Sequence, residues 1–230
     1  MHTHPSDEAV AIYNRFKDLP GSEHIGKPVS IDALMSMCRE MRPRRILEMG
    51  GGIGALSHTL LSHSNAFVDI YEDNEFCRGE LRKNLAEFRG RFQIMDTYRM
   101  LPPEREYDIA VIDGGMGNPG DGGHPLAAQL FLEYVDSVKA VYIEGYRGLQ
   151  RDSVRRALQK KYICAFRPHK DVYVDGKKWA GGLEVRCFPA QSAAMRWMSF
   201  LFWEGVIWAR KHYFRGRAML KNFYGHSKNH

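Results

Sequence analysis

The sequence contains no uninterrupted apolar stretch of about twenty residues, the length that a helix needs to cross a bilayer. Its opening, MHTHPSDEAVAIYNRF, lacks the basic start and the apolar run of a secretory signal. The four cysteines are far apart and form no C-x-x-C pair, so the pattern indicates neither a zinc site nor a disulfide framework. No internal repeat or low-complexity run is present. We therefore expect a cytoplasmic protein with reduced thiols.

The composition is ordinary for a folded protein, with 44% hydrophobic and 26% charged residues. A chain of 230 residues can bury one sizeable core, so we expect one main domain. The formal net charge of +6 favours anionic partners, and much of the excess comes late in the chain. From residue 196 onward, one acid, Glu204, is outnumbered by the basic residues Arg196, Arg210, Lys211, Arg215, Arg217, Lys221 and Lys228.

Residues 1–30 contain several prolines and glycines and one short helical pattern at 9–16. We interpret them as an N-terminal cap, which either packs on the domain or forms a lid over a ligand. Apolar residues at helical spacing then predict a helix over 30–41, with Ser30 as its N-cap and Pro43 as its end. The main domain is predicted over 31–190 and a C-terminal tail over 191–230.

Strands and helices alternate through the predicted main domain. Strands are predicted at 46–47, 66–73, 91–96, 107–115 and 139–145, and helices at 55–63, 74–88, 125–135 and 149–162. Two further strands, 163–175 and 182–188, are joined by a turn-rich link that predicts an antiparallel hairpin. The expected fold class is α/β, with a Rossmann-like, mainly parallel sheet of seven strands, helices on both faces and the hairpin at its end.

A glycine-rich turn, Glu48-Met49-Gly50-Gly51-Gly52-Ile53-Gly54, joins the first predicted strand to a helix. Glycines at such a point allow a tight turn and let a ligand approach the backbone closely. The cluster alone is also compatible with a simple tight turn that binds nothing. Its location between a strand and a helix is what favours a ligand site.

Three acidic residues, Glu72, Asp96 and Asp113, end the next three predicted strands. All three would lie at the carboxyl edge of the sheet, where open α/β sheets place their ligands. A carboxylate at Glu72 can accept both hydroxyl hydrogens of a ribose, and Asp96 could reach an adenine amino group. Each acid alone is better explained as a solvated loop residue or a helix cap, so the argument depends on their shared position.

The glycine turn and these acids resemble the class I S-adenosylmethionine-dependent methyltransferases. Glu48-x-Gly50-x-Gly52-x-Gly54 is similar to the first motif of that family, Glu72 to its ribose acid and Asp96 to its adenine-side acid. The resemblance covers roughly residues 25–188. It implies a methyl-transferring enzyme whose cofactor-binding residues are Glu48, Gly50, Gly52, Gly54, Glu72, Asp96 and Asp113.

The run from GKPVSIDALMSMC into RILEMGGGIG resembles, within that superfamily, the small-molecule O-methyltransferases related to catechol O-methyltransferase. Those enzymes typically bind a divalent metal through an acid after the fourth strand and an Asp-Asn pair after the fifth. Asp113 fits the first position, but Glu144-Gly145 stands where Asp-Asn is expected. A Mg²⁺ site of Asp113, Glu144 and Asp121 is chemically reasonable. Alternatively, Asp113 caps a strand end and Glu144 hydrogen-bonds the following loop.

A hydroxyl acceptor benefits from a base or a metal that lowers its pKa. His124, after the fourth predicted strand, is the first candidate for the base, with Asp113 as the other catalytic candidate. His124 is equally well placed as a cap before the helix that starts at Pro125. His169 could also face the site.

The Asn/Asp-Pro-Pro-aromatic motif, which marks many methyltransferases that act on exocyclic amines, is missing after the fourth strand. Asp113-Gly114-Gly115-Met116 stands there instead. This argues against methylation of the amino group of a nucleic-acid base, though not against an RNA ribose or other targets. The resemblance to the small-molecule O-methyltransferases implies a small-molecule acceptor.

Three other functions fit parts of the pattern. An aminopropyltransferase resembling spermidine synthase would share the glycine turn and the ribose acid, but its usual second acid is missing after Asp113. A nicotinamide-dependent oxidoreductase would prefer G-x-G-x-x-G to the observed G-x-G-x-G. A non-catalytic adenosyl-binding module that recruits a partner through its tail fits the sequence as well as an enzyme does.

The tail is predicted to form an aromatic and basic helix from residue 193, with Trp197, Phe200, Leu201 and Trp208 along one side. Such a helix typically packs on its own domain or across a homodimer interface. Aromatic residues beside Arg and Lys also suit anionic lipid headgroups, so a peripheral membrane contact is the alternative.

Overall fold

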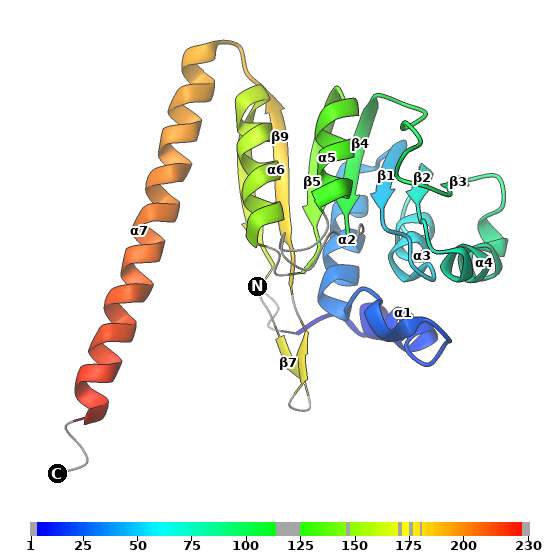
Figure 1. The fold of residues 1–230 in the computed structure, drawn as a ribbon, viewed down its shortest axis with the longest axis horizontal. Helices are drawn as coiled ribbons and strands as arrows, with labels where there is room; N and C mark the ends of the chain where they lie inside the picture. The colour runs from blue at the N-terminus through cyan, green and yellow to red at the C-terminus, as the bar shows by residue number, and fades with distance from the viewer. Residues whose placement is uncertain are drawn as a thin grey trace. The chain divides into compact units, whose positions relative to one another are not determined.

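The computed structural model describes residues 4–113, 125–145, 148–169, 172–174, 177–179 and 181–226 (Figure 1). The chain forms two compact units, one of Met1–Ala157 with Ala165–Cys187 and the other of Leu158–Cys164 with Phe188–His230. The first unit contains the described residues of the candidate site. The second contains the long C-terminal helix α7 (Ala193–His226).

A seven-stranded sheet has the strand order β3-β2-β1-β4-β5-β9-β6. These strands are β1 (Arg45–Met49), β2 (Phe67–Tyr71), β3 (Phe92–Met95), β4 (Glu106–Ile112), β5 (Ser137–Ile143), β6 (Tyr162–Pro168) and β9 (Leu183–Pro189). Neighbours from β3 to β5 pair in parallel, whereas β9 runs antiparallel to β5. The predicted fold class, a mainly parallel sheet of seven strands with an antiparallel end, is confirmed.

Helices cover both faces of the sheet, with α5 in front of it and α2 behind it in Figure 1. The helices besides α7 are α1 (Asp7–Phe16), α2 (Pro28–Met41), α3 (Ala55–Ser62), α4 (Glu75–Asn84), α5 (Pro125–Tyr134) and α6 (Gly148–Lys161), with 3-10 turns at Ser22–His24 and Ala86–Phe88. Because both faces are covered, central strands are apolar runs, and the last four residues of β4, 109–112, are fully buried.

The N-terminal helix α1 is part of the hydrophobic core. It contacts α2 and α3, and its buried face consists of Ala9, Ile12 and Phe16. The N-cap of α1 is Ser6, whose hydroxyl accepts a hydrogen bond from the backbone of Ala9.

The start of α2 differs from the sequence-based expectation. The helix begins at Pro28 with Lys27 as its N-cap, so Ser30 is not the cap but a fully buried residue of the first turn. Proline is well suited to this position because the first helical N–H has no partner within the helix. The hydroxyl of Ser30 instead donates to Glu144 Oε1 at 3.3 Å, which links α2 to the end of β5.

The connection between β6 and β9 contains two additional short strands. β7 (Val172–Val174) and β8 (Lys177–Trp179) pair antiparallel in a small sheet of their own. The sequence predicts one strand that continues to residue 175, so this local expectation was wrong. One long strand and two consecutive strands show the same period-two pattern of side chains, so the pattern does not reveal where the chain leaves the main sheet.

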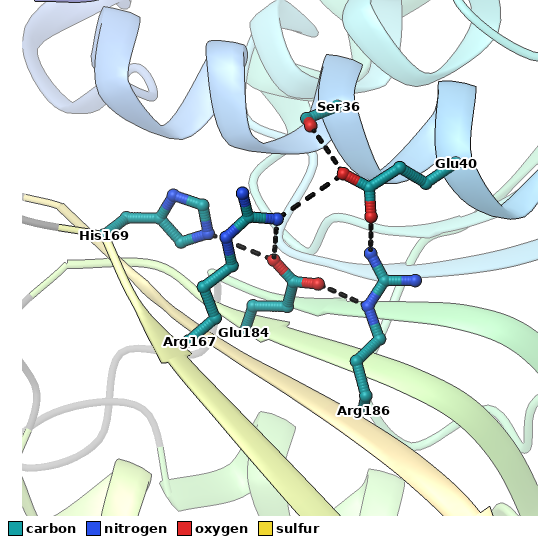
Figure 2. Close-up of polar contacts among 6 residues, drawn as sticks. All are labelled: Ser36, Glu40, Arg167, His169, Glu184 and Arg186. Atoms are coloured by element: carbon teal, nitrogen blue, oxygen red, sulfur yellow. Dashed lines mark hydrogen bonds and ion pairs between the residues drawn. The ribbon is translucent and has the colours of Figure 1, made fainter. Parts of the chain in front are cut away.

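A buried carboxylate on β9, Glu184, is surrounded by positive side chains (Figure 2). Glu184 is 1% exposed. One of its oxygens lies 3.2 Å from Nε2 of His169 and 3.8 Å from Arg167, and the other accepts a hydrogen bond from Nε of Arg186. Arg186 and Arg167 also contact Glu40 of α2, at 2.8 and 3.4 Å. The network therefore joins α2 to β6 and β9.

The charges around Glu184 change its titration. Burial alone would raise the pKa of this carboxyl, but the hydrogen bonds from His169 and Arg186 and their positive charge hold that pKa below its usual range. A lowered pKa in the folded state means that folding favours the ionised form. This contribution to stability is complete above the pKa of the unfolded chain and is lost as the pH falls through the pKa of the folded protein.

We expect Glu184→Gln to lower the free energy of unfolding by roughly 2–4 kcal/mol at neutral pH, because Arg186 and His169 would then face a neutral amide. The difference should shrink in acid, where the native carboxyl is also neutral. Urea unfolding at neutral and acidic pH measures both effects. Glu80→Gln is the control, because Glu80 pairs with a Lys83 that is 72% exposed. The control should change stability by less than about 0.5 kcal/mol; equal losses in the two variants would contradict the expectation.

Candidate functional site

Acidic residues gather at the carboxyl edge of the sheet. Glu48 is the second-last residue of β1, and one acid directly follows each of the next four strands: Glu72, Asp96, Asp113 and Glu144. Backbone hydrogen bonds extend the strand pairing to these acids, since Asp113 N donates to Met49 O at 2.9 Å and Glu144 N to Ile112 O at 3.1 Å. The structure thus places Glu72, Asp96 and Asp113 at the edge where the sequence predicts them.

The glycine turn lies between β1 and α3 and is held against the end of β2. The backbone N–H groups of Gly50 and Gly51 both donate to the carbonyl of Tyr71, at 3.0 and 2.9 Å. Gly50, Gly52 and Gly54 have φ angles of 106°, 52° and 102°, which side chains rarely tolerate. A Cβ at Gly52 would meet nothing within 4 Å, so open space faces this residue.

Gly51 has a different role, which the sequence motif does not reveal. A Cβ atom at this position would come within 2.6 Å of the side chain of Ile70 on β2. The middle glycine of the three therefore allows the turn to approach the sheet closely, while Gly52 leaves space on the open side.

Glu72 connects the turn to the end of β2. Its Oε2 accepts a hydrogen bond from Gly52 N at 2.7 Å and its Oε1 accepts one from Asn74 N at 2.9 Å. Burial raises the pKa of this carboxyl, and the two backbone N–H groups act in the opposite direction. Each oxygen keeps acceptor capacity for another donor, because a carboxylate oxygen has two lone-pair directions.

Glu48 is fully buried and only half satisfied. Ser57 of α3 donates to Oε2 at 2.6 Å, whereas Oε1 has no hydrogen-bond partner within the described part of the chain. The pKa of Glu48 is raised to about 8, mainly by burial and also by the nearby charges of Asp113 and Glu72, while the Ser57 hydrogen bond acts in the opposite direction. The sequence motif identifies Glu48 but not Ser57.

Asp69 in the middle of β2 is an instructive comparison. It is as deeply buried as Glu48, but it accepts hydrogen bonds from Gln93 at 2.7 Å, Tyr107 at 2.9 Å and Arg45 at 3.1 Å. Its partners all come from the protein itself. Deep burial alone therefore does not leave an acid of this fold without hydrogen-bond partners.

An aromatic side chain that the sequence analysis missed lies beside the acids. Tyr98, shortly after β3, is 4% exposed and stacks on Tyr71 with ring centroids 5.6 Å apart. Burial raises the pKa of Tyr98, and the charges of Glu72, Asp73, Asp113 and Glu48 raise it further, so its hydroxyl stays protonated. Tyr98 is distant from the glycine turn in the sequence, and nothing in the local sequence pattern around it indicates a site.

The outer acids have different surroundings. Asp96 is exposed, and its backbone carbonyl accepts a hydrogen bond from Arg78 at 3.1 Å. Glu144 is 8% exposed and accepts the hydrogen bond from Ser30. His169 belongs to the Glu184 network. His124 and Asp121, the other predicted site residues, lie outside the described residues.

The sequence matches no protein-family model and no curated protein. Solved structures do match. An O-methyltransferase from Bacillus cereus in complex with SAH superposes with a TM-score of 0.57 at 14% identity, over 80% of this chain and 92% of that one. The O-methyltransferase TomG from Streptomyces achromogenes, in complex with SAM, gives 0.55 at 16% identity, over 80% and 91%. An RNA methyltransferase candidate from Pyrococcus horikoshii gives 0.54 at 15% identity, over 80% and 98%.

The chain has the class I methyltransferase fold. At these identities the likeness concerns the fold, and it agrees with the strand order and with the antiparallel strand beside β5. Within the methyltransferase fold of this protein, the glycine turn, Glu48 and Glu72 share one edge of the sheet, and Glu48 has an unused acceptor there.

We expect Glu48→Gln to stabilise the ligand-free protein in alkaline solution. The pKa of Glu48 is about 8 in the fold and 4.5 ordinarily, so the fold binds the proton more tightly and its stability declines as the pH rises from about 4.5 to 8. Gln does not ionise. The variant should exceed the native protein by roughly 2–5 kcal/mol at pH 9, and by little at pH 5.

Urea unfolding at the two pH values tests this expectation. Glu75→Gln, at an exposed position of α4, is the control and should show no such pH dependence. If Glu48→Gln differs from the native protein by the same amount at both pH values, the Glu48 carboxyl is not perturbed by burial.

Proposed function

We propose that the protein binds S-adenosylmethionine at the carboxyl edge of its sheet and transfers the methyl group to an oxygen of a small-molecule acceptor. The observation that carries the proposal is the bare Oε1 of Glu48, buried close to the charges of Glu72 and Asp113. Burial raises the pKa of this carboxyl to about 8 because its ionised form costs free energy there, and a cationic ligand beside it would favour that form. S-adenosylmethionine carries a positive sulfur and a positive amino group.

The residues at the edge fit an adenosyl ligand. Glu72 retains acceptor capacity on both oxygens for the hydroxyls of a ribose, and the backbone at Gly52 faces open space. Asp96 is exposed at the end of β3, where an adenine amino group could donate to it. Gly50 and Gly54 support the turn through their positive φ angles. We assign these residues, with Glu48 and Asp113, to donor binding.

S-adenosylmethionine supplies a methyl group that its positive sulfur already activates. The contribution of the protein is to hold the acceptor oxygen in line with the methyl carbon and to remove the hydroxyl proton. His124 is the proposed base, and its imidazole accepts that proton as the oxygen attacks. Asp113 is fixed at the end of β4 by its hydrogen bond to Met49 and is proposed to face the acceptor.

A Mg²⁺ ion is a second way to lower the pKa of a hydroxyl acceptor. Asp113 and Glu144 end the neighbouring strands β4 and β5, and carboxylate oxygens suit a hard cation. Within the described residues, no group of three His, Cys, Asp or Glu side chains could hold a metal. A site with three protein ligands would therefore need a residue outside them, such as Asp121.

Oxygen of a small molecule is the acceptor that the observations favour. Two of the proteins with the same fold, from Bacillus cereus and Streptomyces achromogenes, are described as O-methyltransferases. The sequence also lacks the Asn/Asp-Pro-Pro-aromatic motif after β4. An aminopropyltransferase, a nicotinamide-dependent oxidoreductase and a non-catalytic adenosyl-binding module are the competing functions that the next experiment separates.

Calorimetric titration is expected to give micromolar binding of S-adenosylmethionine and S-adenosylhomocysteine, and none of decarboxylated S-adenosylmethionine or NAD. Parallel titrations with Mg²⁺ and with EDTA measure any metal dependence. Preferred binding of the decarboxylated donor would indicate an aminopropyltransferase, and preferred binding of NAD an oxidoreductase. Donor binding without turnover in an acceptor screen would indicate a non-catalytic module.

Glu72→Ala is the matched variant for this titration. We expect it to weaken donor binding by about 1–3 kcal/mol, through the loss of hydrogen bonds to a charged group. Asp73→Ala removes the adjacent, exposed acid and should leave the affinity nearly unchanged. The assignment of Glu72 to the ribose fails if the two variants bind the donor equally well.

We expect His124→Ala to lower kcat by about 10²–10⁴-fold while the donor Kd stays nearly constant, because a general base acts on the acceptor and not on the donor. Turnover of an acceptor identified by screening provides the kcat, and calorimetry provides the Kd. His169→Ala is the comparison, since this histidine is bound to Glu184. A fully active His124→Ala enzyme would contradict the assignment of His124 as the base.

A further inference from the structure

The C-terminal helix α7 exposes large apolar side chains along the part of its length where side chains are described. It spans Ala193–His226, 34 residues, which corresponds to about 50 Å of helix. The exposed fractions of six of its side chains are 63–64%: Trp197, Met198, Leu201, Phe202, Trp208 and Tyr213. Single exposed apolar residues are common on proteins, but a contiguous set on one helix marks an interaction surface.

The helical register places three of these residues, Met198, Leu201 and Trp208, on one face. With about 3.6 residues per turn, residues three and four apart share a face. One such series contains no charged residue from its first member to its last: Met198, Leu201, Gly205, Trp208, His212, Gly216, Met219 and Phe223. We call this series the uncharged face of α7. Trp197 and Phe202 occupy positions beside it.

The charged residues of α7 fall at other positions of the same register. The helix contains one acid, Glu204, and the basic residues Arg196, Arg210, Lys211, Arg215, Arg217 and Lys221. Arg196, Arg210, Arg217 and Lys221 are spaced so that they share the side opposite the uncharged face. Arg215, seven residues after Trp208, borders the uncharged face, and Trp203, seven residues from both Arg196 and Arg210, lies on the opposite side. The helix thus combines an uncharged face with basic residues at its border and on its other side.

We propose that α7 binds the surface of a bilayer that contains anionic lipids, with its uncharged face at the boundary between headgroups and acyl chains. Tryptophan suits this boundary because its ring is apolar and its N–H is polar, and basic residues beside it attract anionic headgroups. In the part of the chain that the structure describes, no helix has the length and hydropathy to span a membrane. The proposed contact therefore lies along the surface.

The charge of α7 favours lipid over a second copy of the chain. Two such helices would together carry twelve basic residues and two acids, so their pairing would gather a large positive charge in one assembly. An anionic lipid surface neutralises the same residues. The proposal therefore commits to lipid, and a second copy is an alternative outcome of its test.

The test uses the full chain and sedimentation with vesicles of phosphatidylcholine, either pure or with roughly 30 mol% phosphatidylglycerol. We expect binding to the anionic vesicles, weaker binding to the neutral ones, and loss of binding in high salt. Three of the four tryptophans, Trp197, Trp203 and Trp208, lie in α7, so their emission should shift to the blue on binding.

Leu201→Ser with Phe202→Ser should lower the partition coefficient about tenfold or more, because two apolar side chains leave the contact. Met100→Ser with Leu101→Ser is the matched control, since these residues are 44% and 58% exposed between β3 and β4. Circular dichroism verifies that both variants are folded.

The proposal is overturned by absence of vesicle binding, by equal losses in the two variants, or by equal binding to neutral and anionic vesicles. It is also overturned if the protein is dimeric, the α7 variant is monomeric and neither binds vesicles.

Discussion

Parallel pairing of β1 with β2 and β4 is the constraint on which the candidate site depends. Met49 is in register with Tyr71 on one side and with Ile112 on the other. The residues that follow these two, Glu72 and Asp113, must therefore flank the place where β1 passes into its turn. Two acids from distant parts of the chain are brought beside the glycines by backbone hydrogen bonds alone, without long or flexible side chains.

Three buried glutamates of this fold differ in the hydrogen-bond partners of their carboxyl groups. Glu184 is surrounded by cationic partners and is held ionised, and Glu72 is held by two backbone N–H groups. Glu48 has one hydroxyl partner, and its other oxygen has none among the described residues. The first arrangement stabilises the fold and the last does not. A buried group that lowers stability and has no structural role is a common feature of functional sites.

Local patterns predicted the architecture and the position of the acids, because alternating strands and helices leave few topologies and the carboxyl ends of parallel strands share an edge. The start of α2 was predicted wrongly, since Ser30 has a typical capping side chain but donates to Glu144 instead. The Glu184 network was not foreseeable, because its members meet only in the folded chain. Tyr98 was missed for the same reason. The roles of His124 and Asp113 stay predictions.

The two backbone hydrogen bonds of Glu72 have a consequence for the thermodynamics of ligand binding. Its carboxylate is already fixed by Gly52 and Asn74, so a ligand that binds there does not have to immobilise a free side chain. Ordering a flexible residue would cost roughly 0.5–1.5 kcal/mol at that moment. In this protein, folding has already restricted that side chain, so the proposed contact of Glu72 with a ribose would be preorganised by the backbone of the turn.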